Sequence, residues 1–256
     1  YGDNYNVWNS NVAVKKVYRR TLRCASVSGA EKQTTLKLQM ERHDYDEEYE
    51  TRDEGGDGWA NQGVGLFVSF SCTGTCTVSN LVISGNAMAI NYQSSDGVEK
   101  ALSKNNIDMT VGGFAGRTMN SSGTLIFSGV DMKDLIVYGG TSTGGLLGLA
   151  EQTGGGISIQ ILDWSISELT VSKNVTNDGS TGGLVGWQHS KSSLKIGDET
   201  NPCSVDGLYV SVLGTSADSN NAGGLVGGVN NSDITVTNVT MNQLQVNGRK
   251  SKASSG

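Results

Sequence analysis

The pattern with the most direct catalytic interpretation is Gly-Thr-Ser-Thr-Gly at residues 140–144. It matches the G-x-S-x-G nucleophile elbow, whose serine attacks an ester or amide carbon. A hydrolase of this type needs a helix after the elbow, then an acid and a histidine. His189 is the one later histidine, and Glu151 or Asp163 would have to be the acid. The glycine that ends the pattern belongs to a segment that recurs without the serine. We therefore predict no catalytic residue and no enzymatic activity.

Four glycine-rich segments resemble phosphate-binding loops. They read Gly-Gly-Phe-Ala-Gly at 112–116, Gly-Gly-Leu-Leu-Gly at 144–148, and Gly-Gly-Leu-Val-Gly at both 182–186 and 223–227. A phosphate loop also supplies a Lys-Ser/Thr pair for the phosphates and magnesium, and none of the four does. Their recurrence indicates a scaffold, so we predict no cofactor.

The four cysteines allow a disulfide or half of a zinc site. They are Cys24, Cys72, Cys76 and Cys203. The Cys-Thr-Gly-Thr-Cys spacing suits a disulfide across a tight turn, because a central glycine lets the two Cα atoms approach within about 7 Å. Zinc would need a second close cysteine pair or supporting histidines. We predict a Cys72–Cys76 disulfide, with Cys24 and Cys203 either paired or free.

Acidic residues offer two further kinds of site. The alternating acids at 44–50 form a carboxylate ladder, but the segment lacks the glycine and the spaced terminal glutamate of a calcium loop. We therefore predict no metal. Asp131 with Asp134, and Asp163 with Glu168, are the sequence-near pairs that a glycosidase would need, and exposed turn acids are the alternative interpretation. Three tryptophans that sugars could stack on are Trp59, Trp164 and Trp187.

Composition limits the partners. The 256-residue chain has a net charge of −6 and a pI near 4.9, whereas nucleic-acid binding needs a clustered basic surface. No apolar run reaches the roughly 20 residues that span a bilayer. A basic cluster at 15–23 precedes an acidic block at 41–57, so the two segments could pair within one molecule or between molecules. Without an initiator Met or a signal-like segment, we expect a processed chain or a fragment.

Four Asn-x-Ser/Thr sequons are candidate glycosylation sites. They begin at Asn120, Asn174, Asn230 and Asn238. A chain this rich in Ser, Thr and Asn produces such sequons by chance, so their number proves nothing. Their placement in expected turns or solvent-facing positions leaves them usable if the protein is secreted.

The glycine segments mark a repeat, because their first glycines are 32, 38 and 41 residues apart. Two apolar pairs follow each segment. The first pairs are Leu125/Phe127, Ile157/Ile159, Leu194/Ile196 and Ile234/Val236, and the second are Leu135/Val137, Leu169/Val171, Leu208/Val210 and Leu244/Val246. A weaker unit contains Gly63 to Phe67 and Leu81/Ile83. Period-two apolar pairs between turn residues predict short strands, three to a unit.

Each unit has an apolar face that it cannot bury alone, and stacking buries it. The sequence thus predicts an all-β fold, a β-solenoid of about five coils over 59–246 with polar side loops. Residues 1–58 form an N-terminal β segment for capping or assembly, and 247–256 a polar tail. A β-sandwich, with the glycine segments as turns, is the alternative.

The glycine corners, each followed by a Ser/Asn-rich strand and a Leu-x-Val strand, resemble the GLUG-motif repeats of secreted and cell-surface adhesin-type proteins. The resemblance covers 112–246 well and 59–111 poorly, and does not reach 1–58. The units here are longer and less regular than that family's pattern. The resemblance implies a surface-displayed structural or adhesive module and transfers no active-site residue.

We expect the last coil to end at Val246 without a capping element after it. A bare terminal coil exposes strand edges and core side chains. We therefore expect an extracellular structural subunit of a fibre or surface appendage. It would associate head-to-tail with copies of itself, and surface glycans are a further expected partner. A carbohydrate-binding or carbohydrate-cleaving solenoid is the alternative.

Overall fold

The computed structural model describes thirteen segments of the chain. They are residues 4–7, 22–23, 26–27, 30–31, 34–43, 63–90, 110–118, 123–139, 141–150, 156–173, 179–189, 192–212 and 220–248. The regular elements within them are all strands.

Five coils follow one another from residue 63, and each contains two short strands and one long strand. The first short strands are β6 (Gly63–Val64), β9 (Thr110–Gly112), β12 (Ser142–Gly144), β15 (Gly179–Gly182) and β19 (Asn220–Gly223). The second short strands are β7 (Phe67–Phe70), β10 (Ala115–Thr118), β13 (Leu147–Ala150), β16 (Val185–His189) and β20 (Val226–Asn230). The long strands are β8 (Thr75–Ile90), β11 (Thr124–Tyr138) and β14 (Ser158–Lys173). In coils four and five the long strand is divided into β17 (Ser193–Ile196) with β18 (Cys203–Val212), and β21 (Asp233–Val236) with β22 (Val239–Asn247).

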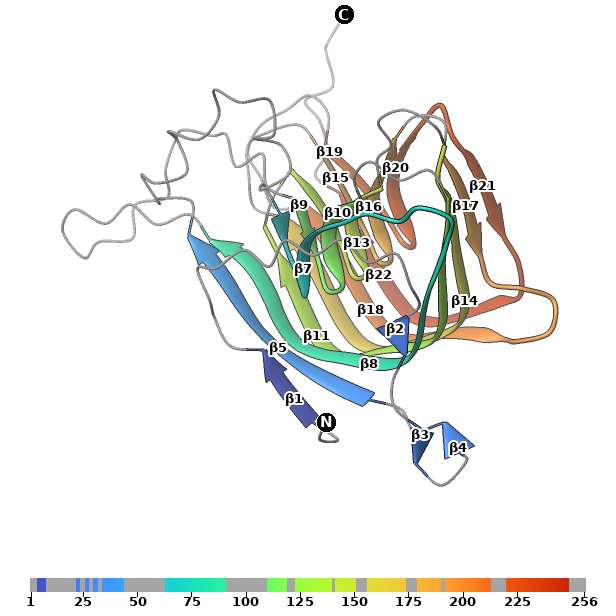
Figure 1. The fold of residues 1–256 in the computed structure, drawn as a ribbon. Coiled ribbons are helices and arrows are strands. Elements are labelled where there is room, and N and C mark those ends of the chain that lie inside the picture. Colours follow the sequence, from blue (N-terminus) through green and yellow to red (C-terminus); the bar gives the residue numbers. More distant parts are fainter. Residues whose placement is uncertain are drawn as a thin grey trace, which may run out of the picture.

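Equivalent strands of successive coils pair in parallel and form three sheets (Figure 1). The first short sheet contains β6, β9, β12, β15 and β19, and the second contains β7, β10, β13, β16 and β20. The long strands form the long sheet, which curves beneath both short sheets in Figure 1. This arrangement confirms the predicted β-solenoid. The β-sandwich alternative is wrong, because it requires antiparallel sheets.

The N-terminal strands extend the same architecture. β5 (Thr34–His43) pairs in parallel with β8, and β1 (Asn4–Val7) pairs in parallel with β5. β2 (Leu22–Arg23) also pairs with β8, while β3 (Ser26–Val27) and β4 (Ala30–Glu31) form a small antiparallel pair. Much of the expected N-terminal segment, and residues 249–256 of the expected tail, lie outside the described residues.

Register pairing across the long sheet aligns apolar residues into five ranks. From coil two to coil five they are Leu125–Ile159–Leu194–Ile234, Phe127–Ile161–Ile196–Val236, Met132–Ile166–Val205–Met241, Leu135–Leu169–Leu208–Leu244 and Val137–Val171–Val210–Val246. We name these the first to fifth ranks. In the coils before the last, all their members are at most 1 % exposed.

Two details differ from the sequence prediction. The first pair of coil three is Ile159 and Ile161, two residues later than expected, because Ile157 precedes the strand. The second difference is that the two apolar pairs of coils two and three lie on one strand of 15 or 16 residues instead of two short ones. In coil one, the pair Leu81/Ile83 aligns with Val130 and Met132.

The long strands bend where single residues adopt a left-handed backbone. One bend aligns Asn80, Gly129, Asp163 and Asn238, and the other aligns Asp134, Glu168, Gly207 and Gln243. Asparagine, aspartate and glycine tolerate this conformation best. The bends therefore curve the sheet while both apolar pairs remain on its inner face.

The glycine segments turn the chain from the first short sheet to the second. At Gly183, the backbone N–H donates to the Gly224 carbonyl of the next coil at 2.9 Å. A Cβ on Gly183 would lie less than 3.0 Å from that carbonyl oxygen, and 2.7 Å from Cδ2 of Leu208 in the fourth rank. The corner therefore packs directly on a long-sheet leucine, which explains why Gly-Gly and Leu-x-Val recur together.

The last glycine of each segment lets the two short sheets approach. A Cβ on Gly186 would lie 2.6 Å from the backbone nitrogen of Thr143, on a first short strand of the preceding coil. Ordinary stacked sheets are about 10 Å apart because side chains fill the gap. Here the backbones are in contact at the glycines. The apolar residues after the glycine pairs of coils two to four, Phe114, Leu146 and Leu184, are fully buried.

Large side chains fill the rest of the core. The four phenylalanines of the chain cluster in coils one and two, with Phe114 at 5.0–5.2 Å between ring centroids from each of the other three. The equivalent corner residues Leu146 and Leu184 are fully buried in later coils. Edge-to-face ring packing thus gives way to leucine packing along the stack.

We expect Gly183→Ala to lower the free energy of unfolding by on the order of 1–3 kcal/mol, because the added methyl group overlaps backbone of the next coil. Gly248→Ala is the matched control, since its Cβ would meet nothing closer than 3.9 Å. Urea unfolding of both variants measures the difference. Equal stability of the two variants would contradict the close packing of the corner.

Candidate assembly surface

The last coil exposes residues that every earlier coil buries. In the second to fifth ranks, Val236 is 50 % exposed, Met241 40 %, Leu244 39 % and Val246 38 %. The same positions in coil four, from Ile196 to Val210, are at most 1 % exposed. We call the exposed apolar residues of coil five the open face, which also includes Val229 at 48 %. The open face is therefore the inner surface of the solenoid, seen end-on.

The backbone of this coil also lacks partners on one side. Among the described strands, β19, β20, β21 and β22 each pair with the preceding coil and with nothing beyond it. An unpaired parallel edge is a template for another strand. The open face thus combines exposed apolar side chains with strand edges that no other described strand pairs with.

The opposite end of the solenoid is covered. In coil one, Val64, Phe67, Phe70 and Ile83 are all 5 % exposed or less. Strand β5 lies along the edge of β8 and contributes Leu38, which is 1 % exposed. The two ends of the stack therefore differ in chemistry as well as in strand polarity.

The structure does not arrange the candidate hydrolase residues as an elbow. Ser142 lies within strand β12 and is buried, and the chain continues into strand β13 where the elbow requires a helix. His189 ends β16 on the other short sheet, with its ring 6.0 Å from that of Trp187. Residues Gly140 and Glu151 lie outside the described residues.

The candidate carboxylates lie at bends of the long sheet. Asp134, Asp163 and Glu168 are exposed, as expected, but they lie within the long strands β11 and β14 at residues with positive φ angles, not in turns between strands. Asp131 is half-buried on β11, where its Oδ1 accepts a 2.6 Å hydrogen bond from the Ser165 hydroxyl. Backbone bends and a cross-strand hydrogen bond therefore explain the positions of these four carboxylates.

The ranges that the structure describes show neither a metal-binding cluster nor a membrane-spanning helix. Within them, no three His, Cys, Asp or Glu side chains gather to hold a metal ion. The same ranges contain no helix long and apolar enough to cross a membrane. The acidic segment at 44–50 and Trp59 fall outside these ranges, while Trp164 is buried at 2 % exposure.

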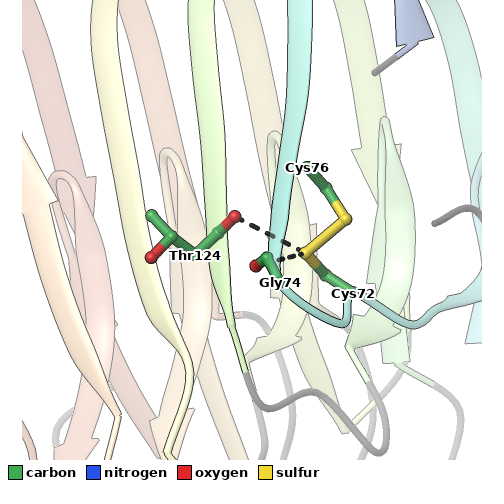
Figure 2. Close-up of a disulfide and its surroundings, with 4 residues drawn as sticks. All are labelled: Cys72, Gly74, Cys76 and Thr124. Carbon is green, nitrogen blue, oxygen red and sulfur yellow. Dashed lines mark hydrogen bonds between the residues drawn. A yellow bond between two sulfur atoms is a disulfide. The ribbon is translucent and has the colours of Figure 1, made fainter. Parts of the chain in front are cut away.

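Cys72 and Cys76 form the predicted disulfide, with their Cα atoms 6.0 Å apart (Figure 2). The bond closes the turn between β7 and β8, and both cysteines are buried. Cys72 Sγ lies 3.6 Å from the Gly74 carbonyl oxygen and 3.5 Å from that of Thr124. A disulfide sulfur carries no proton, so these are packing contacts. The disulfide therefore fixes the first turn against coil two.

Cys203 is unpaired and fully buried at the start of β18, so the expected alternative of a free thiol applies to it. Burial raises the pKa of this thiol above its usual value, although backbone hydrogen bonds from Trp164 and Asp163 act in the opposite direction. Cys24 lies outside the described residues.

Two of the four candidate sequons fall in described parts, and both are in coil five. Asn230 ends β20 and Asn238 occupies the bend before β22, where both are exposed. Asn120 and Asn174 lie outside the described residues. The two visible sequons are therefore accessible and close in sequence to the open face.

No family model, curated protein or solved structure matches this chain. The open face is thus interpreted from its own geometry. Sequence reasoning directed attention to the last coil, but it did not align β5 with the ranks, because Thr34 to His43 carry no glycine corner.

A turn in coil four is held by side-chain-to-backbone hydrogen bonds. Asp198 Oδ1 accepts hydrogen bonds from the backbone nitrogens of Thr200 and Asn201 at 2.7 and 2.6 Å, which, with the Thr200 hydroxyl, lower its pKa to about 2. This turn separates β17 from β18. The signal in the sequence was the Asp-x-Thr-Asn spacing, which is typical of a side-chain-to-backbone turn.

We expect Cys203 to resist thiol reagents in the native protein, because it is buried and its raised pKa keeps it protonated at neutral pH. Titration with Ellman's reagent at pH 8 should leave it unmodified until denaturant is added. Fast modification of this residue before unfolding, located by peptide mapping, would show that the start of β18 opens readily.

Proposed function

We propose that this chain is a structural subunit of an extracellular fibre or surface appendage, whose copies join head-to-tail through the open face. The single observation that carries the proposal is the exposure of Val236, Met241, Leu244 and Val246 in ranks that all earlier coils bury. Because the strands are parallel, the stack has a direction. A contact between unlike ends produces an open polymer when the rotation does not close.

The magnitudes favour a contact that includes backbone pairing. Fully burying an exposed side chain of this size contributes roughly 1.5–3 kcal/mol. Four side chains that are 38–50 % exposed would then contribute on the order of 3–5 kcal/mol. Association costs an estimated 4–15 kcal/mol. Hydrogen bonds from an added strand, each worth about 0.5–1.5 kcal/mol net, would supply the remainder.

Two further points support an extracellular location. Disulfides persist in oxidising compartments, and Cys72 and Cys76 form one here. The resemblance of the glycine corners to GLUG-motif proteins also suggests surface display. That resemblance further suggests an adhesive role, for which glycans on a cell surface are the proposed ligands.

We expect the purified chain to form concentration-dependent oligomers and filaments, observed by sedimentation velocity and negative-stain electron microscopy. Leu244→Lys should abolish them, because the new ammonium group would have to be buried in the fourth rank. Gln245→Lys is the matched control, since this neighbouring residue is exposed and pairs in register with half-buried Tyr209 on the opposite face of the sheet from the ranks.

Circular dichroism and urea unfolding should show that both variants remain folded. A wild-type chain that sediments as a single monomer at every concentration would contradict the proposal. So would equal loss of assembly in the two lysine variants, because the effect would then come from charge and not from the open face.

A further inference from the structure

Strand β5 continues the ranks of the long sheet beyond coil one. Leu36 pairs in register with Ile83, which belongs to the third rank through Met132. Leu38 pairs with Gly85, which aligns with Leu135 of the fourth rank. Leu38 is 1 % exposed and Leu36 is partly buried against the same core. The ranks therefore extend through a strand that precedes the first glycine corner.

Strand β1 extends two of these ranks by one more position. Tyr5 pairs in register with Leu36, and Val7 pairs with Leu38, again in parallel. Tyr5 thus holds the outermost position of the third rank at the N-terminal end of the stack. Val7 holds the same position in the fourth rank. At the other end, the outermost members of these two ranks are Met241 and Leu244 of β22.

We propose that β1 of one copy pairs with β22 of the next in the head-to-tail assembly proposed above, with Tyr5 beside Met241 and Val7 beside Leu244. The inference rests on that proposed function and names the segment that covers the third and fourth ranks of the open face. Strands β1 and β22 run in the same direction, because each strand from β1 through β5, β8, β11, β14 and β18 to β22 pairs in parallel with the next. The long sheet of one copy then continues into the next.

The local sequences fit this pairing. Asn-Tyr-Asn-Val in β1 and Val-Thr-Met-Asn-Gln-Leu-Gln-Val-Asn in β22 contain no charged residue, so no like charges oppose each other. Between its third-rank and fourth-rank residues, β22 has two residues, Asn242 and Gln243, whereas β1 has only Asn6. The same one-residue irregularity already exists between β11 and β8, between Met132 and Leu135. The fold therefore tolerates the mismatch that the contact requires.

Disulfide trapping between two single variants tests the register. Asn4 and Thr240 occupy the two ends of one further row of register-paired residues across the long sheet. The residues between them in this row are Thr35, Val82, Asp131, Ser165 and Ser204. Asn4→Cys and Thr240→Cys are made separately in a full-length Cys24→Ser, Cys203→Ala background that keeps the Cys72–Cys76 bond. We expect a crosslinked dimer when the two variants are mixed under mild oxidation, and none from either variant alone.

The matched control pairs Asn4→Cys with Ser204→Cys. Ser204 is exposed and belongs to the same row of register-paired residues as Thr240, but β22 lies beyond it in the sheet. Neighbouring strands are about 4.8 Å apart, so residues two strands apart exceed the roughly 7 Å that a disulfide spans. This mixture should give no crosslink. Asn6→Cys with Asn242→Cys is a second test pair, in case the first variants fold poorly by circular dichroism.

The outcomes separate this inference from the proposed function. Oligomers in sedimentation without either crosslink would overturn the pairing of β1 with β22 and leave head-to-tail assembly standing. A crosslink from Thr240→Cys alone would show that open faces meet each other, which overturns both. A chain that stays monomeric also overturns both. Crosslinking of both mixed pairs, with none in the Ser204 control, would establish the partner strand and its register.

Discussion

The structure depends on the absence of side-chain volume where the two short sheets meet. At Gly186 the backbone contacts Thr143 of the preceding coil so closely that a Cβ would overlap it, and at Gly183 a Cβ would overlap the next corner and Leu208. Glycine is the one residue that permits both approaches. The corner can then reach the long sheet, and the coils before the last bury their apolar ranks. The glycine repeat is therefore a packing requirement, with no need for a bound phosphate.

Close packing at the corner also fixes the stacking of coils. The backbone N–H of the second glycine of each corner donates to the carbonyl of the second glycine of the next corner, at 2.9–3.0 Å, in the order Gly113, Gly145, Gly183 and Gly224. Each corner therefore sits directly on the next. Parallel strands held in this register align identical positions into ranks, and every coil becomes a template for a neighbour. A stack of this kind cannot satisfy its own ends. Coverage must come from a different segment, as β5 provides at one end.

The sequence predicted the solenoid because its signals are local and repeated, but it misplaced features that depend on three-dimensional alignment. The pairs Leu194/Ile196 and Leu208/Val210 lie in the ranks where expected, whereas coil three uses Ile159/Ile161 because three alternating isoleucines permit two registers. The long bent strands were missed, since the bends occur at ordinary residues such as Glu168 and Gln243 with left-handed backbones. The register of β5 on β8 was not predicted, because nothing in the chain outside the repeat marks which residues it pairs with.

The polarity of the stack determines which assemblies are compatible with it. In a parallel solenoid, joining like ends would turn the edges antiparallel and interrupt the ranks, whereas joining unlike ends continues them. In register, Tyr5 and Val7 hold the N-terminal positions of the third and fourth ranks, and Met241 and Leu244 hold the C-terminal positions. A contact between these ends would continue the parallel register of the coils, so a fibre would grow by the same strand pairing that stacks the coils within one subunit.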